Sequence, residues 1–308
     1  MLLRLLICLC FSSPCLAQQE LPLYPGEIPN SKKGVNTERH VYNPRVDTLA
    51  FDVSLPTITV FQPLTEKANG TAIIIFPGGG YQVLLTKREG SDIAKAFNQN
   101  GITAFVVKYR LPDDSVMINK SIGPLQDAQQ AIRFVRSNAA QWNLDPSKIG
   151  VMGFSAGGHL AASASTLFKK TLIPNPDHVS VRPDFSILIN PVISFSKKLG
   201  HPLTIQNLLG KNPSSLQRKH FSNELNIDDQ TPPAMLIHAV KDTVVVVENS
   251  LQYFEALRRR KIQTSIHVYA NGEHGLLTAP SFDEWFGRCL FWLEELGLYS
   301  NKPVNESN

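Results

Sequence analysis

One stretch of sequence decides the fold of this chain: IGVMGFSAG, from Ile149 to Gly157. Its apolar first half, Ile149–Met152, predicts a strand buried on both faces, and the small residues from Ala156 onward predict a helix. Between strand and helix, the pattern Gly-x-Ser-x-Gly indicates a sharp turn that holds a serine hydroxyl exposed. Ser155 is therefore the candidate nucleophile, and the start of the helix places positive partial charge beside it.

Strand and helix patterns alternate along the chain on both sides of this stretch. Short runs rich in β-branched residues predict strands at 57–61, 72–76, 103–109, 149–152, 185–190, 235–238 and 265–269. Helical patterns of apolar residues occur at 91–98, 125–142, 156–168, 247–261 and 282–296. Such alternation is typical of an α/β fold with a mostly parallel central sheet and helices on both faces. The polar segment Ile193–Pro232, with a brief helical pattern near Ile205–Leu209, is predicted to be an insertion at one end of the sheet.

A serine nucleophile needs a general base, and the base needs a carboxylate that orients it. In this kind of fold the order along the chain is serine, acid, histidine, with each residue just after a strand. Asp242 follows the strand predicted at 235–238, and His274 follows the strand predicted at 265–269. Both lie at the carboxyl ends of their strands, where parallel sheets place their sites. Asp242 and His274 are therefore predicted to complete a catalytic triad with Ser155.

Other acidic and histidine residues fit these positions less well. Glu273 adjoins the predicted base too closely to orient it, and Asp228 and Asp229 precede their strand rather than follow it. His159 lies on the helix that starts at the serine, so it is predicted to pack or hydrogen-bond locally. The remaining histidines fall inside strand patterns or away from strand ends: His40, His178, His201, His220, His238 and His267.

A glycine triplet follows one of the buried strand patterns, in the sequence FPGGGY. Glycines allow backbone N–H groups to approach a ligand without obstruction from side chains. The amides of Gly79 and Gly80, together with that of Ala156, are predicted to form an oxyanion hole. Gly78 is the first alternative donor, and Tyr81 is predicted to line the substrate site.

These motifs resemble those of the α/β-hydrolase superfamily, and within it the secreted carbohydrate esterases related to acetylxylan and feruloyl esterases. The resemblance rests on six stretches: Phe76–Tyr81, Lys108–Pro112, Leu125–Ala128, Gly150–Leu160, Lys241–Asp242 and Glu273–Gly275. It implies an α/β-hydrolase fold with a small insertion after strand 6. It also implies two-step acyl transfer by Ser155, His274 and Asp242, with no cofactor and no metal ion. The expected activity is removal of acyl groups, above all acetyl groups, from a plant cell-wall polysaccharide such as xylan or an oligosaccharide derived from it.

Several other functions share parts of this pattern. A feruloyl esterase or a general carboxylesterase would use the same residues on a different ester. A serine peptidase of the prolyl-oligopeptidase type shares the serine turn and the triad order, but it normally carries a large additional domain that this length does not accommodate. A lipase would be expected to show a long amphipathic lid. A non-catalytic carbohydrate-binding protein would not require all three triad residues.

The composition is that of a globular protein and gives little support for nucleic-acid binding. The 308 residues include 43% hydrophobic and 18% charged residues, with a net charge of +4. The short basic run Arg258–Lys261 lies at a predicted helix end, where it favours the helix dipole. A nucleic-acid binder normally shows a broader basic stripe.

The N-terminus predicts export from the cell. Residues 1–17 combine a short positive start, an apolar run and small residues before Gln18, which is typical of a secretory signal peptide cleaved after Ala17. This divides the chain into a signal peptide at 1–17, an extended leader at 18–39, a hydrolase domain at 40–298 and a C-terminal tail at 299–308. The mature protein is then expected in the periplasm or secreted, without an integral membrane segment and with Cys289 as a buried thiol. The sequence does not indicate an oligomeric state.

Overall fold

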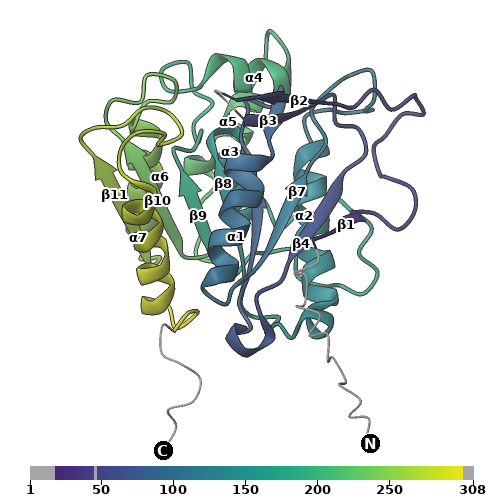
Figure 1. Cartoon of the computed structure of the whole chain (residues 1–308). Coiled ribbons are helices and arrows are strands. Elements are labelled where there is room, and N and C mark those ends of the chain that lie inside the picture. The colour runs from purple at the N-terminus through teal and green to yellow at the C-terminus, as the bar shows by residue number, and fades with distance from the viewer. Residues whose placement is uncertain (1–17, 45–46, 301–308) are drawn as a thin grey trace, which may run out of the picture.

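The computed structural model describes residues 18–44 and 47–300, which form an α/β fold around a central sheet (Figure 1). The strands of this sheet are β1 Gln19–Pro22, β4 Thr57–Phe61, β5 Ala72–Phe76, β7 Thr103–Lys108, β8 Ile149–Phe154, β9 Ser186–Ile189, β10 Ala234–Ala239 and β11 Thr264–Tyr269. Within the described residues the sheet has eight strands, in the order β1-β4-β7-β5-β8-β9-β10-β11. β1 and β4 are antiparallel to their neighbours, and the other six strands are parallel to one another. The predicted α/β architecture with a mostly parallel sheet is confirmed.

β5 shows why the middle of the sheet forms from continuous apolar runs. All of its residues are buried, because helices cover both faces of the sheet. Successive side chains of a strand point to opposite faces, so Ile74 and Phe76 enter the core on one face while Ile73 and Ile75 enter the core on the other. An alternating polar pattern at these positions would have placed polar groups in one of the two cores.

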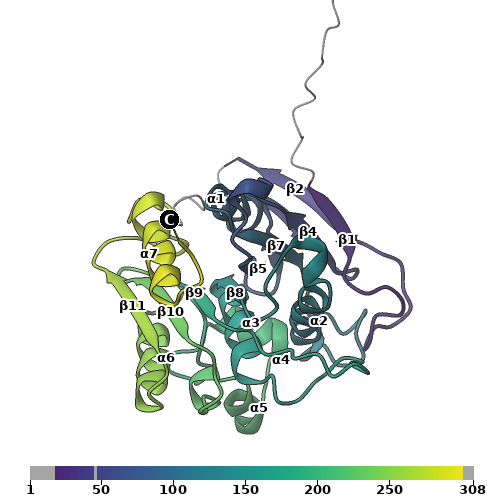
Figure 2. The same ribbon diagram turned by 90° about the horizontal axis from the view of Figure 1, so that it is seen from below.

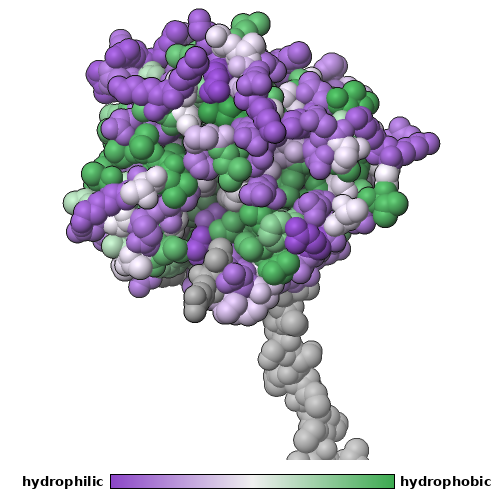
Figure 3. All heavy atoms as spheres, turned by 90° about the horizontal axis from the view of Figure 1, so that it is seen from above, coloured by the Kyte–Doolittle hydropathy of each residue, from purple (hydrophilic) through white to green (hydrophobic). Residues whose placement is uncertain are grey.

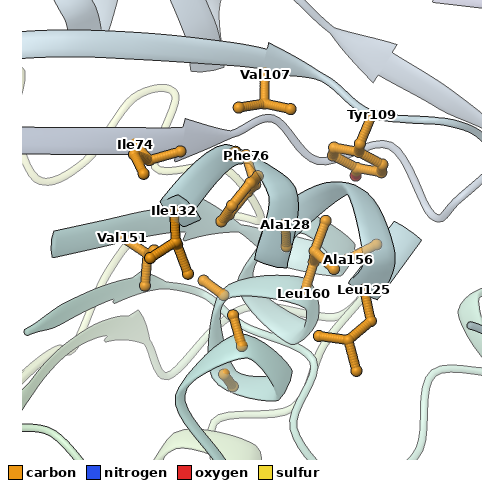
Figure 4. Packing of buried hydrophobic residues seen from close by; sticks show 14 of the residues in the cluster. Ile74, Phe76, Val107, Tyr109, Leu125, Ala128, Ile132, Val151, Ala156 and Leu160 are labelled. Carbon is orange, nitrogen blue, oxygen red and sulfur yellow. The ribbon is translucent and has the colours of Figure 1, made fainter. Parts of the chain in front are cut away.

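Two sets of helices bury the two faces of the sheet. α2 (Gly123–Ser137), α3 (Ser155–Thr166) and α6 (Glu248–Arg259) cover one face, and α1 (Asp92–Gln99) and α7 (Phe282–Glu295) cover the other (Figure 2). Figure 4 shows Leu125 and Ile132 of α2 packed with Leu160 of α3 in the first core. In the second core, Phe97 and Phe286 meet edge to face at 4.8 Å between ring centroids, and Cys289 is buried as predicted. All five helices are as predicted from the sequence, apart from their ends.

The segment predicted as a leader before the domain belongs to the fold. β1 pairs with β4 at the edge of the sheet, and Leu23 and Tyr24 are buried behind it. The Tyr24 hydroxyl donates a hydrogen bond of 2.9 Å to Asp127 in α2. The folded domain therefore includes residues well before the predicted boundary at residue 40. A short edge strand without apolar periodicity carries no signal of its own, because its pairing partner determines its conformation.

A second, smaller sheet was not predicted from the sequence. It consists of β2 (Arg39–Asn43), β3 (Asp47–Phe51) and β6 (Val83–Leu85), paired antiparallel in that order. β2 is almost entirely exposed, so its residues show no alternation of apolar and polar types. Because β6 begins just after the glycine triplet, this sheet holds one end of the glycine-rich loop.

The insertion Ile193–Pro232 contains α4 (Pro202–Leu209), α5 (Ser215–His220) and the short 3-10 helix η4 (Asn223–Leu225). α4 lies at the upper end of the molecule in Figure 1, above the carboxyl ends of the parallel strands. The insertion is therefore positioned to contact the loops that follow those strands.

The ends of the chain bear on the predicted localisation. The predicted signal peptide and residues 301–308 of the predicted tail lie outside the described residues. Within residues 18–44 and 47–300, no helix is both long enough and apolar enough to cross a bilayer.

Candidate active site

Ser155 stands where β8 turns directly into α3. The strand extends two residues further than predicted, to Phe154, and the helix begins at Ser155 itself. Ser155 has a φ of 52°, a left-handed conformation that costs a non-glycine residue about 1–3 kcal/mol. Gly157 allows the close approach of the helix, because a Cβ at this position would lie 2.1 Å from the carbonyl oxygen of Phe76. The local structure is therefore the strained turn that the Gly-x-Ser-x-Gly pattern predicts.

The structure brings Ser155, His274 and Asp242 together in one hydrogen-bonded row. His274 Nε2 lies 2.8 Å from Ser155 Oγ, and His274 Nδ1 lies 2.7 Å from Asp242 Oδ2. A carboxylate only accepts hydrogen bonds, so Nδ1 carries the proton and Nε2 faces the serine hydroxyl as the acceptor. This geometry allows the imidazole to take the hydroxyl proton as the serine attacks a carbonyl carbon.

Asp242 is held on both of its carboxylate oxygens. The backbone amides of Val244 and Val245 each donate to Oδ1 at 2.9 Å, and His238 Nε2 lies 3.3 Å from Oδ2. Burial by itself raises the pKa of Asp242, but the hydrogen bonds from His238 and His274 outweigh it and hold this pKa well below its usual range. Asp242 therefore stays ionised and can stabilise positive charge on His274.

The glycine-rich loop lies beside Ser155, since a Cβ on Gly78 would be 3.1 Å from the Cβ of Ser155. In the described part of the chain, the amides of Gly79 and Gly80 donate to no protein acceptor. The Gly78 amide, which the sequence left as the first alternative, donates instead to Glu89 Oε2 at 2.8 Å. Ala156 lies in the first turn of α3, where backbone N–H groups have no partner within the helix. The Gly79 and Gly80 amides therefore have no partner on a loop that reaches Ser155 at Gly78, and Ala156 directly follows the serine in the chain.

Glu89 is a site residue that the sequence analysis missed. It lies in the short π-helical turn η2 (Lys87–Ser91), where it is buried and bound to the Gly78 amide and to Arg88 Nη2 at 3.1 Å. Burial raises the pKa of Glu89 above its usual range. By engaging Gly78, it fixes the start of the glycine-rich loop. Nothing in the surrounding polar run distinguished this carboxylate, because its role depends on contact with a loop eleven residues earlier.

The role of Tyr81 in lining the substrate site stays a prediction: Tyr81 borders a hollow beside the glycine-rich loop, although its side chain is largely buried. Its ring is 2% exposed, and its hydroxyl lies 3.0 Å from His159 Nδ1. His159 Nε2 in turn donates to the carbonyl oxygen of Phe221 in the insertion, at 2.9 Å, and the imidazole stacks on Phe195 at 4.3 Å. His159 is packed in the interior, as expected, but its hydrogen bonds are not local: this side chain joins the glycine-rich loop, α3 and the insertion.

Acidification is expected to destabilise the protein through His159. Burial lowers its pKa from 6.5 to about 4, so the unfolded chain takes up this proton first as the pH falls. The stability that depends on neutral His159 is complete above pH 6.5 and is lost as the pH falls from 6.5 towards 4. Between pH 7.5 and 5, wild type should lose about 2 kcal/mol more free energy of unfolding than His159→Gln, measured by urea denaturation.

The control for this measurement is His220→Gln, which changes an exposed histidine of α5. It should keep the full pH dependence of wild type. Equal pH dependence in His159→Gln and wild type would contradict the prediction.

Two hollows adjoin the site. The larger, about 450 Å³, lies between α1, α7 and the loop after His274, and much of its wall is apolar, including Phe154, Leu276, Phe282 and Trp285. The smaller, about 180 Å³, adjoins the glycine-rich loop at Tyr81, and its wall carries polar side chains, including Gln82, Asp113, Ser115 and Asn207. Seen from above, the molecule presents hydrophilic and hydrophobic side chains interspersed rather than one broad apolar patch (Figure 3).

Comparison with known proteins identifies the family of this chain. Residues 58–257 match the BD-FAE family. An acetylxylan esterase of Xylanibacter ruminicola is 38% identical over 239 residues, which cover 76% of this chain and 46% of that protein. Endo-1,4-β-xylanase B of Butyrivibrio fibrisolvens is 37% identical over 226 residues, which cover 72% of this chain and 35% of that protein. The chain thus spans less than half the length of these two relatives.

Solved structures agree with the fold. The acetyl ester-xyloside bifunctional hydrolase from Caldicellulosiruptor lactoaceticus aligns with a TM-score of 0.76 and 33% identity, covering 92% of this chain and 97% of that chain. An esterase from Thermogutta terrifontis aligns with a TM-score of 0.66 and 25% identity, covering 91% and 99%. The predicted α/β-hydrolase fold is confirmed, and the family match extends over well more than half of the sequence. The chain therefore belongs to the BD-FAE family of α/β-hydrolases.

Proposed function

We propose that this protein is a serine esterase that removes acyl groups, above all acetyl groups, from xylan or xylo-oligosaccharides. One observation carries the proposal: the hydrogen-bonded row from Asp242 through His274 ends at Ser155, next to the glycine-rich loop in which the amides of Gly79 and Gly80 have no partner among the described residues. Acyl transfer requires a nucleophile, its base and donors for an oxyanion, and these residues supply all three. The acetylxylan esterase and the acetyl ester-xyloside hydrolase among its relatives support acetylated xylan as the substrate.

The first step forms an acyl-enzyme. Ser155 Oγ attacks the ester carbonyl carbon while His274 Nε2 takes the hydroxyl proton. The amides of Gly79, Gly80 and Ala156 receive the negative charge that develops on the carbonyl oxygen. The bond between the acyl carbon and the sugar oxygen then breaks, and His274 gives its proton to that oxygen, which leaves as a hydroxyl group. Asp242, ionised throughout, stabilises the imidazolium that exists between these two proton transfers.

The second step releases the acid. Water attacks the acyl carbon, His274 Nε2 takes a proton from it, and the same amides hold the second oxyanion. When this intermediate collapses, the proton returns to Ser155 Oγ and the carboxylic acid leaves.

A sugar chain suits the surroundings of the serine. The smaller hollow beside the glycine-rich loop carries carboxylate, amide and hydroxyl groups, which are the groups that hydrogen-bond to sugar hydroxyls. Its wall includes Asn207, whose side-chain amide also donates to the Gly80 carbonyl at 2.8 Å. A sugar bound there would therefore lie next to the proposed oxyanion donors.

The test is acetate release from acetylated xylo-oligosaccharides by residues 18–308. Wild type should release acetate, and Ser155→Ala should not. Ser165→Ala is the matched control, because Ser165 lies on the same helix but donates only to the carbonyl of Ala161. Release by Ser155→Ala at the wild-type rate would overturn the mechanism, and Ser155-dependent turnover of aryl acetates alone would overturn the substrate.

A feruloyl esterase is the second candidate, and the larger hollow favours it. Its walls carry Phe154, Phe282 and Trp285, which could pack against an aromatic acyl group. If this hollow holds the acyl group, kcat/KM for a feruloylated arabino-oligosaccharide should exceed that for the acetylated xylo-oligosaccharide. The reverse order would assign the protein to acetyl groups.

Gly79→Ala is expected to reduce kcat by about a hundredfold or more with little change in KM, because an oxyanion donor acts mainly on the transition state. Gly79 has a φ of 128°, and a Cβ there would lie 2.0 Å from the carbonyl oxygen of Val83, so the loop must move. Steady-state kinetics on an aryl acetate measures the effect. Gly287→Ala is the control, since a Cβ on this α7 residue meets no atom within 4 Å and its activity should be unchanged.

We further propose that the protein acts in the periplasm or outside the cell after cleavage behind Ala17. The pattern of residues 1–17 supports this, and so does the substrate, because a cell-wall polymer does not enter the cytoplasm intact. Mass spectrometry of the exported protein should find an N-terminus at Gln18. Retention of the full-length chain in the cytoplasm would contradict the proposal.

A further inference from the structure

A second histidine reaches the triad from inside the protein. His238 lies in β10, four residues before Asp242, and the side chains of both residues are fully buried. Its Nε2 lies 2.8 Å from the carbonyl oxygen of Val245 and 3.3 Å from Asp242 Oδ2. Its Nδ1 lies 2.7 Å from Ser250 Oγ in α6. Every polar atom of this buried imidazole is therefore engaged.

These contacts determine which nitrogen carries the proton. Carbonyl and carboxylate oxygens only accept, so Nε2 must carry a hydrogen that it shares between Val245 and Asp242. The Ser250 hydroxyl holds Nδ1 on the other side of the ring. His274 Nδ1 donates to the same oxygen at 2.7 Å. Asp242 Oδ2 is therefore in contact with two histidines: His274, which faces the nucleophile, and His238, which does not.

We propose that His238 is a positioning residue for the triad, which holds the Asp242 carboxylate in the orientation that aligns His274 with Ser155. The amides of Val244 and Val245 fix Oδ1, and His238 fixes Oδ2 from the side opposite to His274. With both oxygens engaged, the carboxylate cannot rotate about its terminal bond. This inference rests on the proposed catalytic roles of Ser155, His274 and Asp242.

The proposal predicts a pH effect as well as a rate effect. Removing the donor on Oδ2 leaves more negative charge on Asp242, which favours the protonated form of His274. A higher pH is then needed to free the base, so the acidic limb of the pH–rate profile should move to higher pH. The charged and polar groups that act on His274 are the following: Asp242, Asn190 at 3.5 Å, Glu89 with its partner Arg88, and His201 of the insertion. Among these groups, only Asp242 contacts His238, so a change at His238 acts on His274 through Asp242.

The experiment compares His238→Leu with His238→Gln, whose side-chain amide can still donate from a similar position. In His238→Leu, kcat on an aryl acetate should fall about tenfold, the effect of one lost hydrogen bond to a charged group, with KM within a factor of two. The acidic limb should move up by about half a pH unit or more. His238→Gln should recover most of both effects, and His267→Leu, on neighbouring β11, should behave as wild type.

A readout that needs no natural substrate separates this inference from the proposed function. The rate at which paraoxon phosphorylates Ser155, followed by mass spectrometry across pH, reports the state of His274 directly. Wild type that reacts with paraoxon but releases no acetate from xylan would overturn the substrate alone. Wild type that reacts with neither would overturn the proposed chemistry and this inference with it.

A second variant keeps the test valid if the first one does not fold. If His238→Leu does not fold, Ser250→Ala takes its place, because it removes the contact that holds Nδ1 from the other side. It should shift the acidic limb in the same direction by a smaller amount. Folded variants with the wild-type pH profile and wild-type kcat per paraoxon-titrated site would overturn the proposal.

Discussion

Ser155→Ala is expected to reduce kcat for ester hydrolysis by about a million-fold, because it removes the atom that forms the acyl-enzyme. His274→Ala should have an effect of similar size, since without a base the Ser155 hydroxyl is a weak nucleophile. The double variant should be no slower than either single variant. Residues joined by hydrogen bonds of 2.7 and 2.8 Å act as one unit, so their effects do not multiply.

Steady-state rates on an aryl acetate, normalised to the concentration of purified protein, measure these effects. Ser165→Ala is again the control and should retain wild-type kcat. Residual activity above one hundredth of wild type in Ser155→Ala, or multiplying effects in the double variant, would mean that the row of three residues is not the catalytic unit.

The second large effect is on stability. Arg110 and Asp127 form an ion pair in the interior, with Arg110 Nη2 2.8 Å from Asp127 Oδ1 and both side chains essentially unexposed. Arg110→Met leaves the Asp127 carboxylate buried without its guanidinium, and the expected loss is about 3–5 kcal/mol of unfolding free energy. Arg110 Nη1 also donates to the carbonyl of Pro29 at 2.8 Å, so the N-terminal segment should loosen as well.

Urea denaturation of Arg110→Met measures this loss. Arg133→Met is the matched control, because Arg133 of α2 pairs with Asp177, whose side chain is 71% exposed, and such pairs contribute about 0–1 kcal/mol. Adding Asp127→Leu to Arg110→Met should recover part of the loss, since the unpaired charge is then removed. A single variant as stable as wild type would show that the pair does not hold the N-terminal segment in place.

The central sheet and the residues of the site could be predicted from sequence because their signals are local. A strand buried on both faces must be apolar throughout, as in Ala72–Phe76, and the serine turn needs glycines close to Ser155 in the chain. Asp242 and His274 could be placed because each follows a parallel strand, and the carboxyl ends of parallel strands lie at the same edge of the sheet. Their catalytic roles remain predictions until the variants are measured.

The other features of the fold and of the site could not be predicted, because they depend on contacts between distant parts of the chain. The resemblance rested partly on Lys108–Pro112 and Leu125–Ala128, yet only the structure shows why these stretches belong together: Arg110 in one binds Asp127 in the other. The bond between Tyr81 and His159 could not be predicted, because the two residues lie 78 positions apart in the chain. Edge strands such as β2, which are exposed, leave no apolar pattern to detect.

The contacts of His159 and Asn207 limit how this enzyme can be re-engineered. The side-chain amide of Asn207 in α4 donates to the Gly80 carbonyl, and His159 donates to the carbonyl of Phe221 in the insertion. Grafting a longer or shorter insertion from another hydrolase would therefore disturb the glycine-rich loop as well. A successful chimera would have to carry Asn207, Phe195 and Phe221 along with the transplanted segment, so selectivity and turnover in this scaffold change together rather than independently.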